Sequence, residues 1–307
     1  MKYKLPFIII FSILLVACHD KQQSEANQSE LFIYTSIYPI QFITEQIAGE
    51  IATVESIYPP GVDAHTYEPT SREMTQMANS DAFIYLGNFM EVFAEKAVAT
   101  LESQNITFIE IGAHEDLFKQ QNNHHGHDDG HHHSDFDPHI WLDPLRMIEM
   151  ATIINHELIK LAPDHKDQFN ENLTQLVDKL NELDQQFIER LEQKTNKTII
   201  VSHAAYGYWE ERYDLEQIPL SGMTSLDEPS QKELAKIAGV AQEKNIGYVL
   251  FEQNSSNRLA NVIQDYLEAE ALYLHNLEIL TEEDIKNNDD YFSLMKANLD
   301  VLDQATE

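Results

Sequence analysis

The chain has 307 residues, which is enough for two medium-sized domains with hydrophobic cores. Its 52 acidic residues outnumber its 20 lysines and arginines, so the formal net charge is −32 with neutral histidines. We expect no nucleic-acid partner, because binding to phosphates requires a cationic surface. The single cysteine excludes an intramolecular disulfide and a site of several thiolates, so any metal site must use histidine, carboxylate or main-chain oxygen.

The N-terminal segment has the layout of a secretory signal. A short basic head precedes the apolar run 5–16, which is too short for a comfortable membrane-spanning helix. The run ends in Leu-Val-Ala-Cys, which resembles a bacterial lipobox, so we predict that residues 1–17 are removed and that Cys18 is lipidated. The alternative is an ordinary signal with an incidental cysteine. Residues 18–30 are polar and lack apolar periodicity, which predicts a flexible tether.

Strand-like and helix-like runs alternate through residues 31–162. The predicted strands are Leu31–Ile37, Ile51–Tyr58, Ala82–Leu86 and Thr107–Ile111. The predicted helices between them are Ile40–Ala48, Ser71–Asn79 and Met90–Ser103. This alternation predicts an N-terminal α/β lobe with a parallel sheet.

Residues 194–307 repeat the same alternation. The predicted strands are Thr198–Ser202, Leu215–Leu220, Tyr248–Glu252 and Ala271–His275. The predicted helices are Gln231–Lys244 and Asn257–Ala269. We therefore expect two α/β lobes, each with a parallel sheet flanked by helices.

A long helix is predicted between the two lobes, over residues 163–193. Pro163 suits the first turn of a helix, and apolar residues then recur every three or four positions. The stripe consists of Phe169, Leu173, Leu176, Leu180, Leu183, Phe187 and Leu191. At 1.5 Å per residue the helix would be about 46 Å long, which is enough to cross both lobes and hold them rigidly apart. A coiled coil is the alternative interpretation.

Six histidines crowd into a glycine- and aspartate-rich run within residues 122–134. They are His124, His125, His127, His131, His132 and His133. The run has no apolar residue around which to fold, and ordering it would cost backbone entropy. We interpret it as a mobile loop that offers several weak metal sites. The alternative is a solvated low-complexity insert without a function.

Three other histidines lie where the two lobes are expected to bind a ligand. His65 is in a loop after a predicted strand, His139 stands between a proline and an isoleucine-tryptophan pair, and His203 directly follows a strand. Ligands bind at the carboxyl ends of strands in open α/β sheets, and imidazole nitrogen suits zinc. A single loop histidine is more often a hydrogen-bonded structural residue, so the inference depends on all three together.

Five stretches of the chain resemble motifs of the zinc- and manganese-type solute-binding lipoproteins of bacterial ABC importers, cluster A-I. The most specific is DPHIWLDP. The others begin PPGVDAHTYEPT, SHAAYGYWEERYDLE, YVLFEQNSSNRLA and ALYLHNLEILTEED. The resemblance runs from about residue 31 to the C-terminus. It implies a protein anchored by lipid on the extracytoplasmic face of the cell membrane, monomeric and without enzymatic activity, which delivers metal to an integral-membrane permease.

The resemblance also implies the metal ligands. His65, His139 and His203 match three of them, and Glu278 matches an acidic fourth, where many relatives have aspartate followed by proline. A water molecule is the alternative fourth ligand. Manganese-type members tend to carry a carboxylate at the position of His203, whereas three imidazoles and a carboxylate suit tetrahedral Zn²⁺. We therefore expect Zn²⁺ as the transported ion, with Mn²⁺ as second choice.

Two further expectations follow from histidine ligation. A metal-bound imidazole usually donates its other ring N–H to a carboxylate or carbonyl, and the nearby candidates are Asp63, Glu68 and Asp143. Protons compete with the metal for imidazoles whose unperturbed pKa is about 6.5, so affinity is expected to fall as the pH drops through that region.

A zinc hydrolase and a metal-dependent surface adhesin are the rival functions. His156-Glu157 begins like the metalloprotease motif HExxH, but Lys160 replaces the second histidine. Three histidines with a carboxylate would also close the coordination shell, whereas a catalytic zinc keeps an open position. An adhesin with the same fold stays open, because the charge pattern does not identify a host ligand.

Overall fold

The computed structural model describes residues 31–87, 90–118, 136–223, 230–253 and 258–306. The predicted lipidation site Cys18, the tether and the histidine-rich loop lie outside these ranges. Among the described helices, each is too short or too polar to span a lipid bilayer.

The first half of the chain forms a sheet of four parallel strands in the order β2-β1-β3-β4. The strands are β1 (Leu31–Thr35), β2 (Ala52–Ser56), β3 (Ala82–Tyr85) and β4 (Thr107–Glu110). The helices that follow these strands are α1 (Tyr38–Ala48), α2 (Ser71–Met77) and α3 (Ala94–Leu101). Each predicted strand and helix of this half is present, with shorter bounds for the strands.

The second half forms another four-stranded parallel sheet, in the order β6-β5-β7-β8. Its strands are β5 (Thr198–Val201), β6 (Glu216–Pro219), β7 (Tyr248–Glu252) and β8 (Glu270–Leu274), and α7 (Gln231–Glu243) and α8 (Arg258–Leu267) are the predicted helices. The predicted fold class, two parallel sheets flanked by helices, is confirmed. The strand order reverses between β5 and β7, and ligands bind outside the carboxyl ends of strands at such a point.

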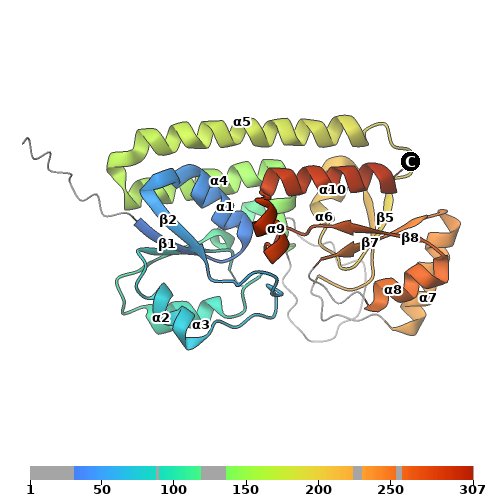
Figure 1. Ribbon diagram of the computed structural model, residues 1–307, viewed down its shortest axis with the longest axis horizontal. Helices are drawn as coiled ribbons and strands as arrows, with labels where there is room; N and C mark the ends of the chain where they lie inside the picture. Colours follow the sequence, from blue (N-terminus) through green and yellow to red (C-terminus); the bar gives the residue numbers. More distant parts are fainter. Residues whose placement is uncertain (1–30, 88–89, 119–135, 224–229, 254–257, 307) are drawn as a thin grey trace, which may run out of the picture.

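The predicted long helix is observed as a 3₁₀ turn, Pro163–His165, followed by α5 (Lys166–Leu191). Pro163 therefore lies in the turn before α5 and not in its first turn. Six of the seven residues of the predicted stripe are buried, and Leu173 is half-buried. With 26 residues the helix is about 39 Å long at 1.5 Å per residue. Figure 1 shows α5 running along one edge of the molecule, over both sheets.

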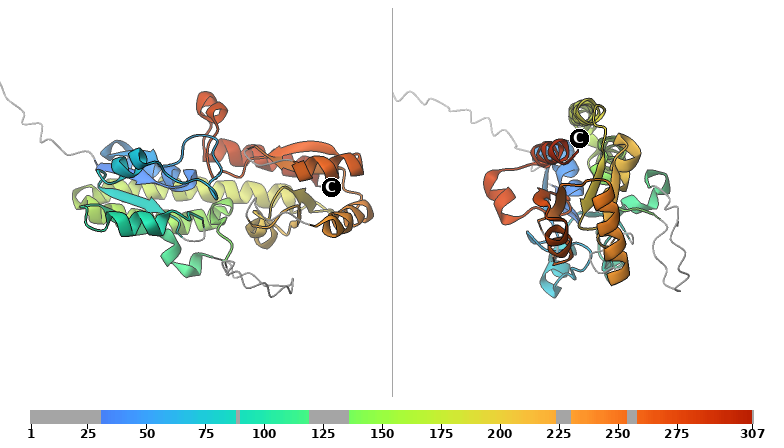
Figure 2. Two further views of the ribbon diagram at one scale, coloured as in Figure 1. Left: turned by 90° about the horizontal axis from the view of Figure 1, so that it is seen from below. Right: turned by 90° about the vertical axis from the view of Figure 1, so that its right-hand side faces the viewer.

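The long helix packs within a layer of helices and does not connect the halves alone. It contacts α1, α4 (Pro144–Leu161) and α10 (Tyr291–Ala305). In the right-hand view of Figure 2, α5 is seen nearly end-on at the top of the molecule. The sequence did not predict α4, α10, or the short helices α6 (Gly207–Tyr213) and α9 (Glu282–Asn287). One continuous hydrophobic core includes side chains from both halves and from α5.

Candidate metal centre

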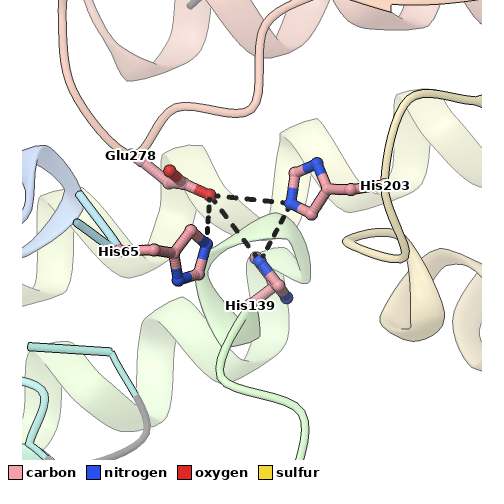
Figure 3. A group of neighbouring side chains, drawn as sticks. All are labelled: His65, His139, His203 and Glu278. Carbon is pink, nitrogen blue, oxygen red and sulfur yellow. Dashed lines mark hydrogen bonds and ion pairs between the residues drawn. The ribbon is translucent and has the colours of Figure 1, made fainter. Parts of the chain in front are cut away.

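Four side chains from distant parts of the chain meet between the two sheets: His65, His139, His203 and Glu278. Figure 3 shows the three imidazole rings and the carboxylate pointing toward one another. His203 follows β5 at the switch point of the second sheet, and Glu278 follows β8. His65 lies in the loop between β2 and α2.

One potential ligand atom from each residue lies within 4.8 Å of all the others. The Nε2 atoms of His139 and His203 are 3.3 Å apart. Glu278 Oε1 lies 3.5 Å from His65 Nε2, 3.6 Å from His139 Nε2 and 3.9 Å from His203 Nε2. The side chains of all four residues are at most 7% exposed to solvent, so the cluster is shielded from water.

His139 is oriented by Asp137, two residues before it. Asp137 Oδ1 accepts hydrogen bonds from the main-chain N–H of His139 at 3.0 Å and from its Nδ1 at 2.8 Å. The 3₁₀ turn Ile140–Leu142 follows and leads into α4, where Asp143 is the N-cap. Because Nδ1 donates to the carboxylate, the lone pair of neutral His139 is on Nε2 and faces the cluster.

The segment around His139 is also bonded to the second half of the chain. The Tyr208 hydroxyl donates to the main-chain oxygen of Asp137 at 2.7 Å. The Trp209 indole N–H donates to the main-chain oxygen of Leu142, also at 2.7 Å. Both aromatic side chains are fully buried and lie on α6, which begins four residues after His203. Two of the four clustered residues therefore share one rigid support.

His203 is oriented by Glu252, the last residue of β7. Its Nδ1 lies 2.8 Å from Glu252 Oε1, and the buried hydroxyl of Tyr206 donates to the same oxygen at 3.3 Å. Since β5 and β7 are neighbours in the sheet, the carboxyl ends of the two strands bring the imidazole and the carboxylate together. The Nε2 atom of His203 therefore also faces the cluster.

His65 is held differently. Its main-chain N–H donates to Asp63 Oδ1 at 2.9 Å, which fixes the turn of the loop. Its Nε2 atom is buried without a hydrogen-bond partner, as is Oε1 of Glu278. Buried polar atoms normally have a partner, so two such atoms facing each other 3.5 Å apart indicate a place for a cation.

The pKa shifts in the cluster favour the protonated forms of His139 and His203 and the ionised form of Glu278. Burial alone would lower the pKa of His139, but the carboxylates of Asp137 and Glu278 outweigh it and raise this pKa to about 9. Burial also opposes protonation of His203, and the Glu252 carboxylate nevertheless raises its pKa. Burial alone would raise the pKa of Glu278, but the imidazoles, His65 foremost, hold it well below its usual range. The metal-free cluster therefore binds protons where a metal ion would supply positive charge.

The carboxylates that orient the rings of His139 and His203 differ from the predicted ones. Asp143 caps α4 and pairs with Arg146, while Oδ1 of Asp63 accepts from the main-chain N–H of His65. The carboxylates that orient the rings are Asp137 and Glu252. Asp137 could have been found from its place two residues before His139, where an aspartate readily forms a turn with the following main chain. Glu252 required knowledge of the strand order.

Two α/β lobes, each with a parallel sheet, and a buried cluster of three imidazoles and one carboxylate between them are the architecture of the two-lobed solute-binding class. Comparison with known families identifies the family within this class. Residues 33–305 match the family model described as zinc-uptake complex component A, periplasmic, and the chain belongs to this family.

Individual relatives agree with this assignment. The zinc-binding lipoprotein AdcA of Streptococcus pneumoniae R6 is 33% identical over 309 residues, and the chain spans 61% of its length. The high-affinity zinc uptake system protein ZnuA of Bacillus subtilis 168 is 30% identical over 304 residues, which cover 96% of this chain and 95% of that protein. The crystal structure of the Zn(II)-bound ZnuA-like domain of pneumococcal AdcA has a TM-score of 0.74 at 33% identity, over 90% of this chain and 99% of that one.

Proposed function

We propose that this chain captures Zn²⁺ outside the cytoplasmic membrane with high affinity and delivers it to the permease of an ABC importer. His65, His139, His203 and Glu278 would be the four ligands. The observation that carries the proposal is the convergence of these side chains on one buried point, with two of the imidazoles already oriented by carboxylates. The zinc-binding relatives named above support the choice of ion.

The geometry of the cluster suits a tetrahedral ion. Zinc lies about 2.0–2.2 Å from nitrogen and oxygen ligands, so neighbouring ligand atoms of a tetrahedral site are about 3.3–3.6 Å apart. Four of the six separations in the cluster are 3.3, 3.5, 3.6 and 3.9 Å. Only small movements would be needed to complete the shell. Mn²⁺ is the second choice, because it prefers more oxygen ligands and six-fold coordination.

A closed shell favours transport over catalysis. Three imidazoles and a carboxylate fill the four positions of a tetrahedral ion and leave none for a water nucleophile. We therefore propose that Zn²⁺ is cargo and that the chain is not a hydrolase. The adhesin alternative needs a host ligand, about which the metal centre carries no information.

Lipid on Cys18 would anchor the protein to the extracytoplasmic face of the cell membrane, and residues 18–30 would let the folded part, as a monomer, reach the permease. Residues 31–162 and 194–307 would form the two lobes, held at a fixed separation by residues 163–193. The histidine-rich loop would gather zinc and pass it to the buried site.

Metal content tests the proposal directly. Wild type and His203→Ala are purified without added metal, and bound metals are measured by mass spectrometry. His156→Ala is the matched control, because the His156 side chain is 69% exposed and lies outside the cluster. We expect zinc in the wild type and the control and much less in His203→Ala. Equal zinc in all three proteins would contradict the assignment, and manganese in place of zinc would select the second choice.

A further inference from the structure

A buried histidine that does not face the metal centre holds the loop that carries Glu278. We propose that His275 is a positioning residue: it binds no metal, but it fixes the main chain so that Glu278 Oε1 faces the imidazoles. The inference rests on the proposed function, because it concerns how the acidic ligand of that same site is held. Its basis is the hydrogen bonding of residues 275–281, between β8 and α9.

The main chain of this loop adopts a strained conformation directly before the ligand. Leu277 has a φ of 60°, in the left-handed region, and its side chain is fully buried. For a residue other than glycine this conformation is unfavourable, because Cβ approaches the following carbonyl oxygen. Such strain persists only when surrounding contacts determine it. The loop therefore needs specific bonds that hold Leu277 in place.

His275 supplies one of these bonds with each ring nitrogen. The main-chain N–H of Leu277 donates to His275 Nδ1 at 2.9 Å. Since Nδ1 accepts, the proton of the neutral ring is on Nε2, which lies 3.0 Å from Asp284 Oδ2. The same oxygen accepts from the main-chain N–H and the hydroxyl of Thr281, the N-cap of α9. The imidazole thus joins the beginning of the loop to the helix at its end.

The backbone of His275 is equally fixed. Its N–H donates to Asn298 Oδ1 at 2.8 Å, and its carbonyl accepts from Asn298 Nδ2 at 2.7 Å. Asn298 is buried on α10, within the helix layer that contacts α5. The ring of His275 is also only 3% exposed, so packing restricts the side chain as well. Because the backbone of His275 is fixed, the hydrogen bond from the Leu277 N–H to its ring also fixes the main chain of Leu277.

The direction of the Glu278 side chain depends on this backbone. Its Oε1 atom is buried without a hydrogen-bond partner, so no protein donor holds this oxygen in place. The main chain of Glu278 is bonded instead: its N–H donates to Asn276 Oδ1 at 3.2 Å, and its carbonyl accepts from the N–H of Tyr38 at 2.8 Å. Without His275, relaxation of Leu277 would rotate the peptide that precedes Glu278 and turn the carboxylate away from the metal.

A double-mutant cycle tests the inference. The zinc dissociation constant is measured by chelator competition for wild type, His275→Leu, Glu278→Ala and the double variant. Loss of a residue that orients a ligand typically lowers metal affinity about 10- to 100-fold, and we expect His275→Leu to fall in this range. In the Glu278→Ala background the same change should alter affinity by no more than about 2-fold, because the ligand that His275 positions is absent.

Partial rescue and a stability control separate positioning from general damage. In His275→Asn, the side-chain oxygen can accept the N–H two residues on, so this variant should bind zinc with an affinity between those of wild type and His275→Leu. Thr198→Val is the matched control, because Thr198 is a buried, hydrogen-bonded residue at the end of β5 away from His203. It should lower stability and leave zinc affinity unchanged. Visible spectra of the Co²⁺ forms would show whether His275→Leu and Glu278→Ala change the coordination in the same way.

The outcomes distinguish the two proposals. If wild type does not bind zinc tightly, the proposed function itself is wrong. If wild type binds tightly but His275→Leu weakens zinc equally in both backgrounds, or not at all, His275 is an ordinary core residue and the inference is overturned. If His275→Leu fails to fold, the comparison of His275→Asn with wild type in the same two backgrounds decides the question.

Discussion

The Nε2 atoms of His139 and His203 lie 3.3 Å apart although the two residues are 64 positions apart in the chain. In each ring the other nitrogen, Nδ1, donates its N–H to a buried carboxylate, Asp137 for His139 and Glu252 for His203. The two inward lone pairs therefore face one point. Two protonated imidazoles at this distance would repel each other. A proton on Nε2 also occupies the lone pair that a metal ion needs, so protons and the metal ion compete for the same atoms.

Zinc affinity should rise with pH well above neutrality. Because the pKa of His139 is raised to about 9 in the metal-free protein, this ring must lose a proton before it can bind zinc at pH 7. We expect affinity to increase by up to about tenfold per pH unit between pH 7 and 9, and to continue to fall below pH 7. Chelator competition at pH 6, 7, 8 and 9 measures this, and a curve that is already flat above pH 7 would contradict it.

Protonation of His139 also makes the unfolding free energy of the metal-free protein depend on pH. The folded-state pKa of His139 lies above its unfolded value of about 6.5, so its protonated form stabilises the fold. That contribution is fully present below about pH 6.5 and is lost as the pH rises through about 9. Urea unfolding of metal-free protein should therefore show lower stability at pH 9 than at pH 6.5. In His139→Gln this part of the pH dependence should disappear; its persistence would assign the effect to another group.

The parts of the fold that could be predicted are those with a local signal. The alternation of β-branched runs with amphipathic helices gave all eight strands, and the stripe of α5 is regular because one face is buried along its whole length. The helix α4 has a similar pattern, with Met147, Met150, Ile154 and Leu158 buried after an aspartate N-cap. It was not predicted, although these buried residues recur every three or four positions.

The residues of the candidate site likewise fall into two groups, those with a local sequence signal and those without one. The three histidines stand in recognisable motifs, so their sequence contexts sufficed to select them. The role of Glu252 depends on β5 and β7 being neighbours, and that of His275 depends on the left-handed conformation of Leu277. Neither relationship has a signature at the level of the sequence. Glu252 and His275 are therefore revealed by the tertiary structure alone.

Gly207→Ala should weaken zinc binding although it places a better helix former in α6. A Cβ atom at Gly207 would lie 2.6 Å from Asp137 Oδ2, so the carboxylate that orients His139 would have to move. We expect a loss of about 10-fold in zinc affinity, at the lower end of the range for partners of ligands. Chelator competition measures it.

Gly239→Ala is the matched control for this change. Gly239 lies in α7, and a Cβ atom there would meet no atom within 4 Å. Alanine should stabilise that helix by up to about 1 kcal/mol without altering zinc affinity. In an Asp137→Ala background, Gly207→Ala should have little further effect. An equal loss in both backgrounds would mean that the clash acts on something other than Asp137.

Tyr208→Phe should destabilise the protein and loosen the contact between its halves. The change removes the hydroxyl that donates to the main-chain oxygen of Asp137 at 2.7 Å and leaves a buried acceptor without that partner. The expected loss in unfolding free energy is about 1–3 kcal/mol, measured by chemical denaturation. Tyr266→Phe, at a position that is 62% exposed, should cost almost nothing. Equal effects of the two changes would show that the Tyr208 bond contributes little.

Deletion of the histidine-rich loop should separate weak from tight zinc binding. The rings of Phe118 and Phe136, on either side of the segment, have centroids only 6.4 Å apart. Removal of residues 122–134 leaves four residues to bridge these ends, so the motif that begins at Asp137 need not move. We expect the tight site to keep its affinity within about 2-fold, since distant sites are additive, while total zinc bound at saturation falls. Replacement of the six histidines by asparagine, with the loop length kept, should have the same effect. If either change abolished tight binding, the loop would have to supply a ligand, and the four-residue site proposed above would be wrong.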